Sequence, residues 1–135
     1  MAEPVLRWRL RVGHSYRDLL VWQKAKALAV DVYRVTATFP KHETYSLSQQ
    51  LQRAAVSVVS NIAEGQGRLN KREFVQFLGI ARGSVVEAAT QLEIAHDLGY
   101  IDDATFERLD LETRNVHGLI NRLLDSLQTR ASSIP

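Results

Sequence analysis

From Asp18 onward, apolar residues recur at spacings of three and four along the chain, which is typical of amphipathic α-helices. The first such segment ends at the sequence FPK, because Pro40 disfavours helical geometry at Phe39. Ser15 is a candidate N-cap for this helix. Its predicted core-facing positions are Trp22, Ala25, Ala29, Val32, Thr36 and Phe39.

The second segment is predicted to be helical from about Leu47 to Glu64. Ser46 and Gln49 have the spacing of a capping box at its start, and Gly65 is a natural C-terminal stop. Its predicted core-facing positions are Leu47, Leu51, Ala54, Val58 and Ile62.

The third and longest segment opens with a second pair at capping-box spacing, Asn70 and Glu73, and ends at Gly99. Asp102 or Asp103 opens the fourth. The predicted core-facing positions are Phe74, Phe77, Ala81, Val85, Ala88, Leu92 and Ala95 in the third helix, and Phe106, Leu109, Thr113, Val116, Ile120, Leu123 and Leu127 in the fourth.

Four amphipathic helices joined by short loops predict an all-α fold, an antiparallel up-down-up-down four-helix bundle over residues 15–129. Residues 130–135 are interpreted as a disordered tail. Residues 1–14 contain RWRLRV, in which basic and apolar residues alternate, and three interpretations are open: a short strand, a docking arm or a disordered leader. We favour a flexible or partner-dependent arm, because an isolated strand has nothing to pair with.

The helices carry more apolar residues than one core-facing stripe requires. A helix that is apolar around much of its circumference packs on more than one side. Since the chain has no fifth helix to cover the second side, we expect that side to meet another copy of the chain. The extra apolar positions are Val21, Leu28, Val35, Val56, Val75, Ile80, Val86 and Ile94.

Composition and charge narrow the class of protein. The 135 residues are typical of one domain, and the absence of cysteine excludes disulfides, thiolate metal ligands and a cysteine nucleophile. No apolar run approaches the roughly 20 residues that span a bilayer, and the N-terminal sequence is too broken by arginine for a signal peptide. We therefore expect a cytoplasmic protein without membrane contact.

The net charge of +2 conceals an uneven distribution. Residues 1–82 contain 13 Lys and Arg against 6 Asp and Glu, a net of +7, whereas residues 83–135 contain 4 against 9, a net of −5. Such a split fits either a basic face for an anionic partner or attraction between the two halves of a bundle.

The segments SNIAEG, FVQFLGIARGS and TQLEIAHDLGY resemble a four-helix bundle family. That family includes the small proteins encoded by intervening sequences within bacterial 23S ribosomal RNA genes. It is also similar to accessory proteins of diversity-generating retroelements, which bind nucleic acid and a reverse transcriptase. The resemblance covers roughly residues 16–125. It implies a four-helix bundle that assembles as a homopentameric ring, binds nucleic acid and has no catalytic activity.

The sequence GQGRLNKR, between the second and third helices, places three basic residues beside a helix start. It is not a dinucleotide-binding fingerprint, because Asn70 stands where that motif needs a glycine and the loop follows a helix. A plain bend explains the glycines and Asn70 but not Arg68, Lys71 and Arg72. Cations oppose the helix dipole there, at a cost of about 0.3–1 kcal/mol each, which a bound anion would offset. A bend and an anion site both stay open.

Nucleic-acid binding, with structured RNA as the expected ligand, is our leading hypothesis. If the loop is only a bend, the arm is the better candidate, because Trp8 can stack on an unpaired base while its arginines meet phosphates. The candidate residues are Arg68, Lys71 and Arg72 in the loop and Arg7, Trp8, Arg9 and Arg11 in the arm. The alternative is a structural or protein-interaction scaffold that binds no nucleic acid.

Short polar side chains on the second and third helices predict a partly buried hydrogen-bond network or subunit interface, with a ligand pocket as the alternative. A solvated helix face usually carries Lys and Glu instead. The candidate residues are Arg53, Ser57, Ser60, Asn61 and Glu64 in the second helix and Arg82, Ser84, Glu87 and Gln91 in the third.

Glu93 and His96 have the Glu-x-x-His spacing of di-iron carboxylate bundles, which need two such motifs and two further glutamates. The chain has one copy, beside the core positions Leu92 and Ala95. No Ser-His-Asp or paired-carboxylate arrangement can be argued from the sequence. We therefore predict no metal, no cofactor and no enzymatic activity.

Overall fold

The computed structural model describes residues 15–132, and within this range the chain is all-α, with four α-helices and no strand. The helices are α2 (Leu20–Thr36), α3 (Leu47–Gln66), α4 (Lys71–Asp97) and α5 (Asp103–Ser132), with two short 3-10 helices, η1 (Tyr16–Asp18) and η2 (Lys41–Glu43). The predicted arm, residues 1–14, lies outside the described residues. Because α5 continues to Ser132, residues 130–132 of the predicted tail are helical, and residues 133–135 lie outside the described range.

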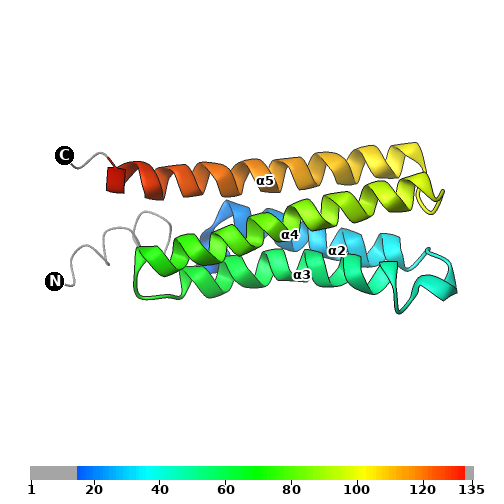
Figure 1. Ribbon diagram of the computed structural model, residues 1–135, viewed down its shortest axis with the longest axis horizontal. Coiled ribbons are helices and arrows are strands. Elements are labelled where there is room, and N and C mark those ends of the chain that lie inside the picture. Colours follow the sequence, from blue (N-terminus) through cyan, green and yellow to red (C-terminus); the bar gives the residue numbers. More distant parts are fainter. Residues whose placement is uncertain (1–14, 133–135) are drawn as a thin grey trace.

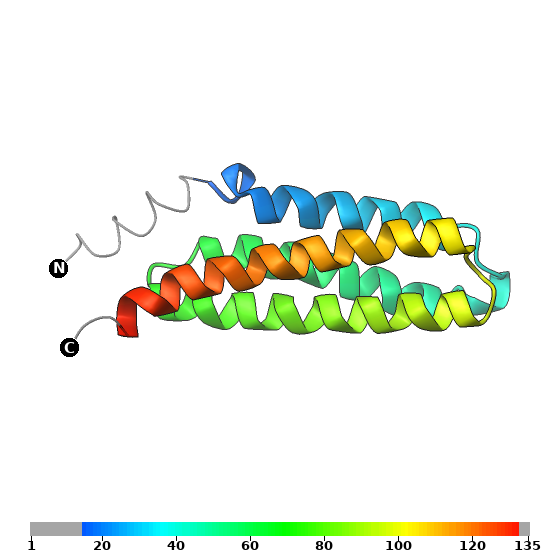
Figure 2. The same cartoon turned by 90° about the horizontal axis from the view of Figure 1, so that it is seen from above.

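The four helices lie side by side along the long axis of the molecule, and the connecting loops alternate between its two ends (Figure 1). α3 packs against α2 and α4, whereas α5 packs against α4 and α2. α2 and α4 are therefore diagonal to each other. The view from above shows them at opposite edges, with α5 between them (Figure 2).

One hydrophobic core runs through the bundle and contains most of the predicted core-facing positions, including all five in α3. It also contains Val21, Leu28 and Val35, so the prediction that these residues meet another copy is wrong. α2 packs against both α3 and α5, and its buried face is consequently wider than one stripe. The extra apolar positions that are exposed are Val56, Ile80, Val86 and Ile94, while Val75 is partly buried.

The predicted starts of the last two helices agree with the structure. Asn70 Oδ1 accepts a hydrogen bond from the Glu73 N–H at 2.8 Å, and Asp102 Oδ1 accepts one from the Thr105 N–H at 2.8 Å. These side chains satisfy N–H groups that have no partner within the helix. After α4, Gly99 adopts a φ of 78°, a conformation that favours glycine and turns the chain towards α5.

The predicted caps of the first two helices are wrong. Ser46 makes no capping hydrogen bond, and the Leu47 N–H donates to Glu43 Oε1 at 3.4 Å instead. Ser15 Oγ accepts a hydrogen bond from the Arg17 N–H at 3.2 Å and therefore caps η1 rather than α2. In both places a short 3-10 helix precedes the α-helix, which sequence spacing alone did not indicate.

Gly65 does not stop α3, contrary to the prediction, because the helix continues to Gln66 and Gly67 is its C-cap. Gly65 is buried against α4. A Cβ atom at position 65 would lie 2.6 Å from Phe77 Cβ and 2.9 Å from Phe74 Cδ1. The glycine therefore allows α4 to approach the last turn of α3 closely.

We expect Gly65→Ala to destabilise the protein by about 1–3 kcal/mol, as overpacking typically does. Phe77 Cβ is attached to the backbone and cannot rotate away from the new methyl group. The measurement is the free energy of unfolding from urea denaturation.

The matched control is Gly118→Ala in α5, where an added Cβ atom meets nothing within 4 Å. This variant should be as stable as the wild type or more stable, since alanine is favoured over glycine in a helix by about 1 kcal/mol. Equal effects of the two substitutions would contradict the proposed steric role of Gly65.

Candidate functional site

The three cations of the α3–α4 loop differ in their surroundings. The Arg68 guanidinium forms an ion pair with Glu64 Oε1 at 2.9 Å and lies 4.7 Å from the centre of the Phe77 ring. Stacking on an aromatic face and pairing with a carboxylate are both ordinary structural roles of arginine. Arg68 therefore has a structural explanation that needs no bound anion.

Lys71 and Arg72 occupy the first turn of α4, and neither forms an ion pair with a residue in the described part of the chain. Arg72 is exposed and Lys71 is half-buried. Their positive charges oppose the dipole of a 27-residue helix. The loop thus presents two cations that no described carboxylate neutralises.

The candidate residues of the arm, Arg7, Trp8, Arg9 and Arg11, lie outside the described residues. The described chain begins at the end of the bundle where α3 meets α4 (Figure 1). η1, which follows immediately, packs against both α2 and α3. The chain therefore enters the bundle at the same end as the loop cations.

Hydrogen bonds between short polar side chains join α3 to α4. Ser57 Oγ and Ser84 Oγ lie 2.8 Å apart, and Asn61 Nδ2 donates to the Ser57 carbonyl at 2.8 Å and to its hydroxyl at 3.0 Å. Further along α4, Gln91 Nε2 donates to Glu87 Oε1 at 3.3 Å, whereas Gln91 Oε1 is buried without a hydrogen bond.

The other predicted network residues lie elsewhere. Arg82 donates to Asn121 Oδ1 at 3.1 Å, across the contact between α4 and α5. Glu64 pairs with Arg68. Arg53 and Ser60 are exposed. The structure thus joins Ser57, Asn61 and Ser84 in one network and pairs Glu87 with Gln91. The remaining predicted residues lie at the contact with α5, beside the α3–α4 loop and on the surface.

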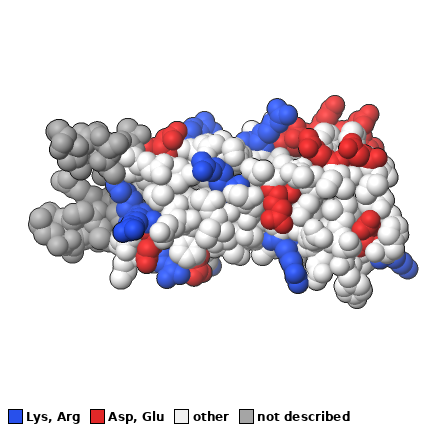
Figure 3. Space-filling view, in the orientation of Figure 1, with Lys and Arg blue, Asp and Glu red and all other residues white. Residues whose placement is uncertain are grey.

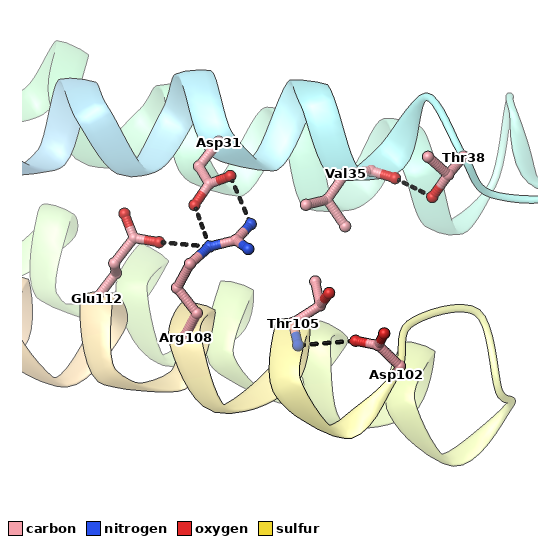
Figure 4. Close-up of polar contacts among 7 residues, drawn as sticks. All are labelled: Asp31, Val35, Thr38, Asp102, Thr105, Arg108 and Glu112. Carbon is pink, nitrogen blue, oxygen red and sulfur yellow. Dashed lines mark hydrogen bonds and ion pairs between the residues drawn. The ribbon is translucent and has the colours of Figure 1, made fainter.

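An ion cluster between α2 and α5 was not anticipated from the sequence. Arg108 donates to both carboxylate oxygens of Asp31, from Nη2 at 2.9 Å and from Nε at 3.2 Å (Figure 4). Glu112, one turn later, places Oε2 4.0 Å from the same Nε atom (Figure 4). Arg108 and Asp31 are 77 positions apart, so no local spacing could reveal their pairing.

Two carboxyl groups share one guanidinium in this cluster, and they titrate differently. Burial, a hydrogen bond with Asp31 and the negative charge of Asp31 raise the pKa of Glu112 to about 7. Burial opposes a lowered pKa at Asp31, but hydrogen bonds with Glu112 and Arg108 outweigh it. A hydrogen bond between the two carboxyl groups requires a proton on one of them, because an ionised carboxylate can only accept. Glu112 Oε2 is buried and has no hydrogen-bond partner among the described residues, which favours the protonated form of Glu112.

The Glu93 and His96 pair does not form part of a larger ligand set. His96 Nε2 lies 2.6 Å from Asp103 Oδ1, and its ring stacks on Phe106 with the ring centres 4.4 Å apart. Glu93 is exposed. Among residues 15–128, no three His, Asp or Glu side chains are placed to hold a metal ion together.

Acidic side chains cluster at the end of the bundle where α4 meets α5 (Figure 3). Exposed carboxylates at the acidic end include Asp97 and Asp103. None of the helices described here is long and apolar enough to cross a membrane.

The chain is similar to a known protein family and to a solved structure. A family model described as 23S rRNA-intervening sequence protein matches residues 17–122. A crystal structure of a protein of unknown function from the S23 ribosomal protein family of Bacteroides thetaiotaomicron is also similar, with a TM-score of 0.74 over 78% of this chain and 96% of that chain. At 20% identity, this similarity concerns the fold alone. No curated protein matches the chain.

The ion cluster predicts a stability that falls as pH rises. Because the folded pKa of Glu112 is about 7 against an ordinary value of 4.5, the folded state retains a proton that the unfolded chain releases within this window. Because the pKa of Asp31 is lowered from its ordinary value of 3.8, Asp31 changes the stability only below about that pH, and it does not affect the range in which Glu112 titrates. Glu112→Gln should therefore be more stable than the wild type above about pH 8, by on the order of 2 kcal/mol after allowance for solvent screening.

Urea denaturation between about pH 5 and pH 9 measures this difference. The variant should show a flatter dependence on pH than the wild type. Glu107→Gln, on an exposed position of the same helix, is the control and should retain the wild-type dependence. Parallel curves for the wild type and Glu112→Gln would show that the cluster does not hold a proton.

Proposed function

We infer a function from the premise that this chain belongs to the 23S rRNA-intervening sequence protein family. We propose that it is a non-enzymatic scaffold of identical four-helix bundles that binds nucleic acid, and RNA in particular. In this proposal each bundle is antiparallel, with up-down-up-down topology, and the copies form the ring of five that the family resemblance implies. The proposed location is the cytoplasm.

Assembly is supported by apolar side chains that the bundle leaves uncovered. Ile80 and Val86 on α4 are each more than half exposed, at 53% and 52%, and Val56 on α3 is 41% exposed. These residues lie in the middle of their helices. Contiguous exposed apolar surface on a small domain commonly marks a protein interface.

The observation that carries RNA binding is the pair Lys71 and Arg72, two cations without a carboxylate partner among the described residues. Phosphate groups are the natural partners of such cations at a helix N-terminus. A ring would repeat the pair in every copy, and multivalency would strengthen contacts that are weak individually. The arm residues Arg7, Trp8, Arg9 and Arg11 extend the proposed site.

A second candidate function, a scaffold that docks a protein partner, is favoured by Arg68. Its ion pair with Glu64 and its stacking on Phe77 give it a structural role. If Lys71 and Arg72 are likewise only solvated, the loop is a bend and the apolar face of α4 becomes the functional surface.

The first prediction of this proposal concerns mass. Light scattering of the purified wild-type protein at micromolar concentration should give about five times the mass of one chain. A monomer under these conditions would refute the ring.

The second concerns the loop. Lys71→Ala with Arg72→Ala should weaken RNA binding about equally for unrelated sequences, because phosphate contacts carry no base information. The slope of log affinity against log salt should become shallower by about 0.7 per lost contact for single strands, or 0.9 for duplex. Fluorescence anisotropy over a salt series measures both effects.

Arg114→Ala with Arg122→Ala is the matched control, since it removes the same charge from exposed positions of α5. This variant should bind with nearly the wild-type slope. If the loop variant binds RNA as well as the wild type does, the RNA contacts lie outside the loop. If the wild type binds no RNA at low salt, the protein scaffold is favoured.

A further inference from the structure

We propose that the exposed apolar ridge of α4 in one copy docks into a groove between α2 and α3 of the next copy. This inference rests on the proposed ring and names the two surfaces that would close it. We define the α4 ridge as Ile80, Gly83, Val86, Thr90 and Ile94, and the α2–α3 groove as the concave surface lined by Ala29, Val30, Tyr33, Val56 and Val59, with Lys26, Arg34 and Ser60 completing its lining.

The α2–α3 groove is an apolar depression on the outside of the bundle. Its volume is about 410 Å³, and aliphatic side chains and one tyrosine provide most of its lining. Val30, Tyr33 and Val56 are exposed there, at 41%, 49% and 41%. The groove is therefore large enough for several aliphatic side chains, and none of the described residues fills it.

The α4 ridge has the shape that such a groove requires. Its members follow each other at spacings of three and four residues, so they lie on one face of the helix. The buried residues of α4, such as Leu78, Val85 and Leu92, lie on the opposite face. At Gly83 an added Cβ atom would meet nothing within 4 Å, which leaves room for the backbone of another helix to approach.

Charge complementarity supports a second copy as the occupant. Lys26 and Arg34 lie at the groove, whereas the exposed charges beside the ridge include Glu87 and Glu93. Arg82, on the same helix as the ridge, is hydrogen-bonded to Asn121 on α5. Docking the ridge into the groove would bring carboxylates towards basic side chains, which favours correct pairing.

The positions of the two surfaces favour a head-to-tail contact. α2 and α4 are diagonal in the bundle and lie at opposite edges of it in Figure 2. The ridge belongs to α4 and the groove to α2 and α3, so the two are different surfaces of the chain. A contact between two different surfaces of the same chain repeats from copy to copy, and it closes into a ring when the rotation allows. A self-complementary patch would stop at a dimer instead.

A nucleic-acid base is the other occupant that a tyrosine between two cations suggests. The polar edges of a base need hydrogen-bond partners when they leave water. Among the neutral side chains of the groove, only those of Ser60 and Tyr33 offer one. The apolar lining therefore favours the α4 ridge.

The test uses two variants that each block one surface, Val56→Glu in the groove and Val86→Glu on the ridge. Both residues are exposed in the single bundle, so both variants should fold, which circular dichroism and thermal unfolding check. Each variant alone should sediment as a monomer. Mixed in equal amounts at high concentration, they should form a heterodimer and nothing larger, because only one intact ridge and one intact groove remain.

Leu111→Glu, at an exposed apolar position of α5, is the control and should assemble as the wild type does. A monomeric wild type would refute the ring itself. An oligomeric wild type whose two blocking variants remain oligomeric would refute the groove and ridge contact while leaving the ring intact. If the two variants are monomeric alone and remain monomeric when mixed, the head-to-tail pairing is wrong. If Val56→Glu assembles but loses RNA binding, the groove is an RNA site instead.

Discussion

The fold depends on the close packing of α3 against α4, and at Gly65 the two helices leave no room for a side chain. The phenylalanine side chains of α4 fill the space that a side chain at this position would need. This approach fixes the α3–α4 loop directly beside it and allows Arg68 to reach the Phe77 ring. The loop whose cations suggest phosphate binding is therefore held in place by a packing constraint.

The four helices differ in what they leave outside the core. α5 carries ion pairs along its surface, and its contact with α2 contains the cluster of Asp31, Arg108 and Glu112. α3 and α4 meet through short hydroxyl and amide side chains and expose aliphatic residues on their outer faces. A solvated α5 and the exposed aliphatic residues of α3 and α4 fit an assembly in which α5 lies on the outside of the proposed ring.

Periodicity predicted the number of helices and most of the core, because burial in an amphipathic helix is a local property of spacing. The caps at Asn70 and Asp102 were equally local. The prediction was wrong for Gly65 and for Val21, Leu28 and Val35, since their burial depends on which helix packs against which side. The ion pair of Asp31 and Arg108 joins residues 77 positions apart and could not be predicted from one sequence.

Assembly and nucleic-acid binding are thermodynamically linked in the proposed function. Lys71 and Arg72, which have no ion-pair partner in the described part of the chain, provide only a few phosphate contacts in one copy. So few contacts give weak binding at physiological salt. A ring raises the effective concentration of the remaining sites once one copy has bound. Ligand that binds the ring better than the single bundle must, by the same linkage, stabilise the ring. The exposed aliphatic face of α4 and the two cations at its N-terminus would then act together. Assembly through the aliphatic face would repeat the cations around the ring and so raise the affinity for RNA.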